Sequence, residues 1–219
     1  MTKGVYIIGT DTEVGKTYIT ALIIQALRGQ GLDAGYFKAA LSGDNQGVND
    51  ARYVLNACGL GEKAAECVPY IYQTPVSPHL AAKLEGVTPE IETIKATFRQ
   101  VAASHDYLVA EGSGGIICPL SYDAGQKIML TDIIKLTGFP VVIVAPCRVG
   151  TINAALLTAS YAQNQGLEVA GFILNRYEPA SLVHQDNAYM LENLSQLPII
   201  ARVQQGDGHI SLSELWPGK

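Results

Sequence analysis

The sequence predicts an α/β fold in which a mostly parallel β-sheet carries helices on both faces. Short apolar runs alternate with stretches of helical periodicity along the chain, and strands that alternate with helices form parallel sheets. The run at 141–145 is almost entirely β-branched, which is typical of a strand covered on both faces. A hydrophobic content of 48% and a charged content of 16% exclude a disordered chain.

The elements follow one another in a regular order from the N-terminus. An apolar run at 5–8 precedes a helix at 16–28, whose apolar residues recur at helical spacing. Pro89 stands at the start of a helix that covers 90–104, where a proline is well tolerated. We expect strands at 5–8, 34–38, 107–110, 141–145, 169–174 and 197–201, and helices at 16–28, 90–104, 152–162 and 181–194.

Two long segments and a glycine-rich turn separate these elements. Residues 40–49 and 75–88 are expected to be long functional loops. Residues 112–115, Gly-Ser-Gly-Gly, are expected to form a turn after the strand at 107–110. No linker, internal repeat or charge block divides the chain, so we expect a single domain over residues 1–219.

Charge and composition narrow the range of partners. The 15 basic and 20 acidic side chains give a net charge of −5, and no basic run is present. Nucleic acids and anionic membranes both require a positive patch, so neither is an expected partner. No apolar run approaches the roughly 20 residues that span a bilayer, and the first residues lack a secretory signal. The four cysteines are scattered, which predicts buried thiols and no zinc site or disulfide framework. We therefore predict a cytoplasmic protein.

The sharpest functional signal is the segment 9–17, Gly-Thr-Asp-Thr-Glu-Val-Gly-Lys-Thr. It lies between the first predicted strand and the first predicted helix, the context that a phosphate-binding P-loop requires. The amides of such a loop bind phosphate oxygens, Lys16 would reach the terminal phosphates, and the Thr17 hydroxyl would ligate Mg²⁺. In the usual pattern the first glycine falls at position 10, whereas here it is Gly9. The loop is a variant, and it predicts a P-loop NTPase fold.

Further motifs follow the loop in an order that resembles the dethiobiotin synthetase family, the ATP-dependent carboxylases of biotin biosynthesis. The similar segments are 37–43 (Phe-Lys-Ala-Ala-Leu-Ser-Gly), 49–51 (Asn-Asp-Ala), 77–79 (Ser-Pro-His), 109–115 (Val-Ala-Glu-Gly-Ser-Gly-Gly), 149–153 (Val-Gly-Thr-Ile-Asn) and 171–175. Two segments depart from the family. Ala39 replaces a proline, and 201–205 lacks the Gly-x-Ile-Pro-like segment near the C-terminus that contacts adenosine.

The resemblance implies a reaction, its cofactors and an assembly. In the family, CO₂ adds to 7,8-diaminopelargonic acid as a carbamate, ATP converts the carbamate to a carbamic-phosphoric anhydride, and the second amine closes the ureido ring. The products are dethiobiotin, ADP and phosphate, and the implied cofactors are ATP and Mg²⁺. The chain would be one P-loop ATP-dependent carboxylase domain in a homodimer, with residues 150–153 reaching the substrate of the neighbouring subunit.

The resemblance also implies a set of site residues. The catalytic residues would be Lys38, Lys16 and Thr12, and the metal ligands would be Thr17, Asp50 and Glu111. The ATP-binding residues would be Glu13, Val14, Gly15, Lys16, Thr17, Tyr18, Asp50, Glu111, Gly112, Ser113, Gly114, Asn175 and Arg176. The substrate-binding residues would be Thr12, Lys38, Ser42, Gly150, Thr151, Ile152 and Asn153.

The chemistry of these residues suits the roles, although each has a simpler alternative. The carbamate and the γ-phosphate are both negative, so cations must stand near both. Asp50 is either a metal ligand or an acid at a helix N-terminus, and Asp44 is a rival ligand in the same segment. The amide of Asn175 either binds an adenine edge or closes a strand turn. No residue stands out as a general base.

Two other classes of protein, the switch ATPases and the amide-forming ligases, are alternatives to this function. Switch ATPases of the plasmid-partition or septum-positioning type share the P-loop architecture, but they carry a second lysine early in the loop, where this chain has Asp11. Residues 211–219 do not form the basic amphipathic helix of a membrane-docking ATPase. An amide-forming ligase of cobyrinic acid synthesis would add a glutaminase domain, for which 219 residues are too few.

Overall fold

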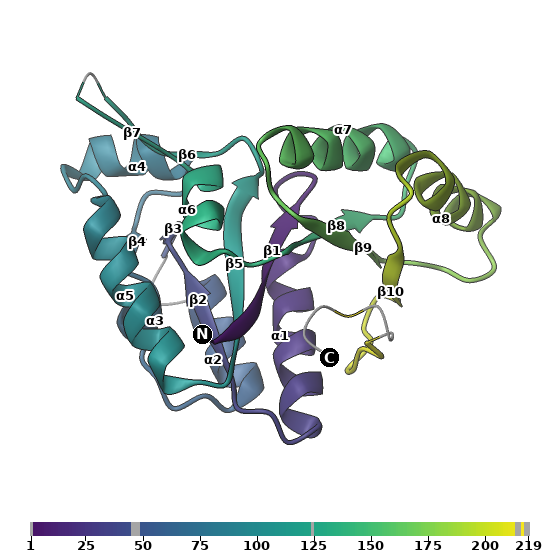
Figure 1. Ribbon diagram of the computed structural model, residues 1–219, viewed down its shortest axis with the longest axis horizontal. Coiled ribbons are helices and arrows are strands. Elements are labelled where there is room, and N and C mark those ends of the chain that lie inside the picture. The colour runs from purple at the N-terminus through teal and green to yellow at the C-terminus, as the bar shows by residue number, and fades with distance from the viewer. Residues whose placement is uncertain (1, 45–48, 124, 213–215, 217–219) are drawn as a thin grey trace.

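A six-stranded parallel sheet forms the centre of the computed structural model, which describes residues 2–44, 49–123, 125–212 and 216 (Figure 1). The strand order is β10-β9-β8-β1-β5-β2. Every neighbouring pair in this sheet is parallel. The strands are β1 (Lys3–Gly9), β2 (Ala34–Lys38), β5 (Tyr107–Gly115), β8 (Val141–Pro146), β9 (Val169–Asn175) and β10 (Ile199–Val203).

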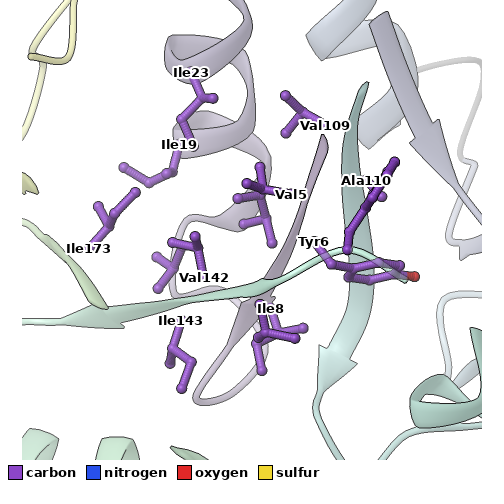
Figure 2. Packing of buried hydrophobic residues seen from close by; sticks show 14 of the residues in the cluster. Val5, Tyr6, Ile8, Ile19, Ile23, Val109, Ala110, Val142, Ile143 and Ile173 are labelled. Atoms are coloured by element: carbon purple, nitrogen blue, oxygen red, sulfur yellow. The ribbon is translucent and has the colours of Figure 1, made fainter. Parts of the chain in front are cut away.

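Side chains on both faces of this sheet are buried. On β1, Val5 points toward α1, whereas Tyr6 and Ile8 point away from it (Figure 2). All three are fully buried, so both faces of the strand are covered. This burial on both faces explains why the strands are almost continuously apolar.

The helices are α1 (Lys16–Gly29), α2 (Asp50–Cys58), α3 (Ala64–Cys67), α4 (Pro78–Glu85), α5 (Ile91–Ser104), α6 (Leu130–Thr137), α7 (Thr151–Asn164) and α8 (Leu182–Ser195).

Two small sheets stand beside the central one. Strands β3 (Ala40–Ser42) and β4 (Tyr70–Tyr72) pair in parallel, and β6 (Pro119–Asp123) and β7 (Gln126–Met129) form an antiparallel pair. Figure 1 shows α4 and the β6–β7 pair at the upper left, to the left of the carboxyl end of β5 in this view. No helix in the described part of the chain combines the length and apolar character needed to cross a membrane.

The predicted fold class is confirmed, and the predicted strands and helices agree with the structure to within about two residues at most ends. Three loop predictions were wrong in part. Residues 112–115 continue strand β5 and form no separate turn, residues 40–42 form β3, and α4 lies inside the segment 75–88. Residues 45–48 of the predicted loop, and most of the segment 211–219, lie outside the described residues. The structure also contains α2, α3, α6, β4, β6 and β7, which the apolar periodicity did not reveal. These elements are short, so each offers few positions in which a period can be recognised.

Candidate active site

The phosphate-binding loop lies between β1 and α1, as predicted. Its last glycine, Gly15, has φ of 95° and precedes the first residue of α1. A Cβ atom at Gly15 would lie 2.1 Å from Nδ2 of Asn175, so any side chain there would collide with β9. Glycine is therefore required both by the left-handed backbone and by the packing.

Two residues at the end of β9, Asn175 and Arg176, support the loop through hydrogen bonds to its carbonyl groups. The Asn175 side chain donates to the carbonyl of Val14 at 2.9 Å, and its own oxygen accepts from the amide of Arg176 at 2.9 Å. Arg176 donates to the carbonyl of Glu13 at 3.2 Å. The Asn175 amide is therefore bonded to backbone groups through both its nitrogen and its oxygen, and one N–H and one lone pair are left for another partner.

A cavity of about 650 Å³ opens beside the loop. It brings together the three predicted catalytic residues, Lys38, Lys16 and Thr12, and one further predicted substrate-binding residue, Ser42. Its lining residues are Thr12, Glu13, Gly15, Lys16, Thr17, Lys38, Leu41, Ser42, Asp50, Pro75, Val76, Ser77, Pro78, Ser113, Gly114 and Cys118. A second cavity of about 520 Å³ shares four of these residues and adds Tyr18, Gly43, Asn49 and Tyr53. The segments that converge here are separated by up to a hundred residues in the chain.

Lys38 stands at the centre of an ionic cluster beside this cavity. Its ammonium lies 2.6 Å from a carboxylate oxygen of Asp50 and 2.8 Å from Oε1 of Glu111. In the pairing of β2 with β5, Lys38 lies directly opposite Glu111. Tyr36 is two residues earlier on the same face of β2, and its hydroxyl donates to the other oxygen of Glu111 at 3.1 Å. The register of two neighbouring strands therefore builds the cluster.

The cluster shifts the pKa values of its members. Burial alone would lower the pKa of Lys38, but the carboxylates of Glu111 and Asp50 outweigh it and raise the pKa to about 12. Burial alone would raise the pKa of Asp50, and the Lys38 ammonium lowers it overall. Lys16 has a lowered pKa because of burial and because of the Lys38 charge nearby. Two cations thus act on one another in the same site.

Two carboxylates and a hydroxyl gather where the sequence predicted metal ligands. The Thr17 hydroxyl donates to Oε1 of Glu111 at 2.9 Å, the same oxygen that Lys38 contacts. The rival ligand Asp44 accepts from Asn49 instead, at 2.8 Å, and does not line the cavity. Within the described residues no three His, Cys, Asp or Glu side chains form a metal cage. One or two carboxylates with a hydroxyl fit Mg²⁺, which takes its other ligands from phosphates and water.

Some predicted site residues lie away from the cavity. Glu111 and Gly112 are buried and do not line it, Val14 is a buried residue of the loop, and Asn175 and Arg176 lie behind the loop. At the start of α7, the Thr151 hydroxyl donates to the carbonyl of Pro146 and accepts from the amide of Arg148. Residues 150–153 therefore close a local turn and do not contact the cavity of their own chain.

The sequence reasoning missed two residues of this region. Tyr36 is fully buried against Glu111, which raises its pKa together with burial, the larger cause. Cys118 lines the cavity as a buried thiol, and burial raises its pKa to about 11. The sequence could have indicated Tyr36, because it stands two residues before Lys38 on a predicted strand and therefore on the same face. No pattern marked Cys118.

The fold and the loop define a P-loop nucleotide-binding protein. Among solved structures, the MinC:MinD cell division complex of Aquifex aeolicus matches with a TM-score of 0.58 and 19% identity, covering 93% of this chain and 82% of that one. Chloroplast FtsY of Physcomitrella patens matches with a TM-score of 0.58 and 15% identity, covering 98% of this chain and 63% of that one. At these identities the likeness shows the fold alone.

The sequence comparisons define the family. A family model described as an AAA domain matches residues 3–208. The chain is 46% identical to the ATP-dependent dethiobiotin synthetase BioD of Clostridium botulinum, over 98% of this chain and 97% of that protein. It is 45% identical to the protein of the same name from Brachyspira hyodysenteriae, over 98% and 96%. The chain belongs to the dethiobiotin synthetase family and is a ligase that forms carbon–nitrogen bonds.

Proposed function

We propose that this enzyme carboxylates 7,8-diaminopelargonic acid with CO₂ and closes the ureido ring of dethiobiotin at the cost of one ATP. The observation that carries the proposal is the presence of two lysines, Lys16 and Lys38, in one cavity with the phosphate-binding loop. A reaction between a carbamate and a γ-phosphate needs a positive charge beside each anion. Lys16 is the first residue of α1, and Lys38 is the last residue of β2.

The chain's own residues have distinct roles in this proposal. Lys16, which donates to the carbonyl of Asp11 at 2.9 Å, would turn to the terminal phosphates. Lys38 would hold the carbamate, and the hydroxyls of Thr12 and Ser42 would orient the nitrogen-bearing end of the substrate. Cys118 and Val76 give the cavity apolar wall on which the alkyl chain of the diamine can lie.

ATP would lie on the loop, and Mg²⁺ would be held by Thr17, Asp50 and Glu111. When bound, the metal would neutralise charge on the β- and γ-phosphates. The hard oxygen donors of the cluster support this assignment. Whether Asn175 and Arg176 contact the base stays a prediction, since both now hold the loop.

A homodimer is also part of the proposal. Large apolar side chains near the start of α7 and on α7 and α8 are exposed, and such exposure is typical of an interaction surface. The exposed residues are Val149, Leu157, Leu182 and Tyr189, at 87%, 62%, 79% and 64% of their surface. The cytoplasmic location expected from the sequence stays a prediction.

The test is incorporation of labelled bicarbonate into an acid-stable product with ATP and Mg²⁺. Incorporation should require 7,8-diaminopelargonic acid. The Lys38→Ala variant should lower kcat on the order of 10²–10³-fold, because a donor to developing negative charge is lost. Lys95→Ala is the matched control, since Lys95 is on α5, away from the residues that line the cavity, and pairs with Glu92. ATP turnover that needs a protein or membrane partner and ignores the diamine would favour a switch ATPase instead.

A further inference from the structure

The three residues expected to ligate Mg²⁺ are Thr17, Asp50 and Glu111, and all three take part in the hydrogen bonds and ion pairs around Lys38. The Lys38 ammonium contacts Asp50 and Glu111 directly. Thr17 donates to the same Glu111 oxygen that Lys38 contacts. Carboxylate oxygens that suit a divalent cation are therefore already in contact with an ammonium group of the chain itself.

A divalent cation bound to these carboxylates would compete with the ammonium for them. Mg²⁺ binds oxygen at about 2.0–2.1 Å, whereas the ammonium already lies 2.8 Å from Oε1 of Glu111. Both cations would then lie within a few ångström of each other, where like charges repel. The repulsion is screened least on the Glu111 side, where the Lys38 side chain is 3% exposed and that of Glu111 is fully buried, whereas the Asp50 side chain is 49% exposed.

A second position for the Lys38 ammonium is available in the cavity. The residue lines the cavity together with Ser42 and Thr12, where the acidic group of the substrate is expected. The long flexible stem of a lysine lets the ammonium move while its backbone stays paired in β2. Tyr36 keeps its own contact with Glu111, so the carboxylate stays oriented when the ammonium leaves.

We propose that Lys38 is a resident cation of the metal site, which leaves Asp50 and Glu111 when a divalent cation binds and then serves the substrate. This inference rests on the proposed function for the identity of the substrate group, but not for the exchange of cations. Metal binding and substrate binding would thereby be coupled, since occupation of the oxygens by metal frees the ammonium for the carbamate. By linkage, substrate would in turn increase metal affinity.

The first test measures Mn²⁺ binding to the free protein by electron paramagnetic resonance, without nucleotide. Lys38→Met removes the competing charge and retains most of the length of the side chain, so Mn²⁺ affinity should rise at least about tenfold. Lys16→Met is the matched control, because it removes a nearby charge that does not occupy the carboxylates, and its effect should be much smaller. An unchanged affinity in Lys38→Met, or an equal gain in both variants, would overturn the proposal.

The second test uses the wild-type protein and so does not depend on how a variant folds. A buried, paired ammonium gives an observable ¹⁵Nζ signal in nuclear magnetic resonance, and absence of this signal from Lys38→Arg assigns it. The signal should persist with ADP alone and shift or disappear when Mg²⁺ is added with ADP. A signal that Mg²⁺ and ADP leave unchanged would refute the exchange. Neither test uses the diamine, so failure of the carboxylation assay would not affect them.

Discussion

At Gly15 the phosphate-binding loop approaches β9 more closely than any side chain would allow. The same contact lets Asn175 support the loop through the carbonyl of Val14. A single residue therefore joins the nucleotide loop to the far side of the sheet, and the position can be tested directly.

We expect Gly15→Ala to lower the free energy of unfolding by more than about 2 kcal/mol, because a left-handed backbone is strained for alanine and its Cβ would meet Asn175. Gly31→Ala is the control, since Gly31 also has a positive φ, of 83°, but nothing lies within 4 Å of its Cβ position. That variant should cost only the strain, about 1 kcal/mol. Urea unfolding measures both, and equal losses would show that the contact with Asn175 is unimportant.

Asp50 should make stability depend on acid pH. Its pKa is lowered in the folded protein, despite burial, by Lys38. A depressed carboxyl pKa contributes stability that is complete above the unfolded value, about 4, and disappears as the pH falls through the folded value. Wild type should therefore exceed Asp50→Asn in unfolding free energy at pH 6, and the difference should shrink steadily below pH 4. A constant difference across this range would contradict the ion pair.

At the scale of elements, helix α2 places a site residue at its first position. Its N-cap, Asn49, accepts from the amide of Arg52 at 2.9 Å, and Asp50 follows as the first helical residue. Asp50 was expected to be either a residue of the site or an acid at a helix N-terminus. The two alternatives are compatible, because the acid at the N-terminus of α2 also contacts Lys38.

Asn49→Ala should cost about 1 kcal/mol of stability through loss of the cap. Ser181→Ala is the matched control, because Ser181 caps α8 by accepting from the amide of His184. Both variants should lower the melting temperature, but only Asn49→Ala should also weaken Mn²⁺ binding, since α2 positions Asp50. Metal titration by calorimetry checks this, and equal metal affinities in the two variants would argue against it.

At the scale of the whole molecule, the described residues that line the cavity include no further cation for the far end of the substrate. The two cationic side chains among them, Lys16 and Lys38, are assigned to the phosphate and carbamate. The N-terminus of α7 offers free amides for a carboxylate, but it lies outside the cavity of its own chain. A second copy of the chain is the source that the homodimer proposal provides.

Mixing two inactive variants tests this shared site. Lys38→Ala removes the proposed contact with the carbamate, and Gly150→Trp damages the start of α7. If sites are shared, a mixed dimer carries both defects in one site and leaves the other intact, so activity should return to about a quarter of wild type in an equal mixture of a symmetric dimer. Subunit exchange is verified by mass spectrometry. Continued inactivity of verified mixed dimers would mean that each chain builds its own site.

Local signals made much of the fold predictable. Apolar runs mark β1, β8 and β9 because both faces of these strands are buried, and the glycine loop with Lys16 marks the start of α1. The Gly-Ser-Gly-Gly segment misled because glycine usually signals a turn. Here it extends β5, and Gly115 pairs with Gly9 of β1. At Gly112 a Cβ atom would lie 3.0 Å from Leu130, so close packing favours glycine within this strand.

Residue order along the chain determined which elements form and which chemical groups are available, because periodicity and loop motifs act over a few neighbouring residues. The partners of those groups were decided by tertiary structure. Lys38 meets Glu111 only because β2 pairs with β5 in one register, and Asn175 meets the phosphate loop only because β9 ends behind it. These contacts join residues 73 and 161 positions apart. Their energies depend on burial and charge, which exist only once the sheet has assembled.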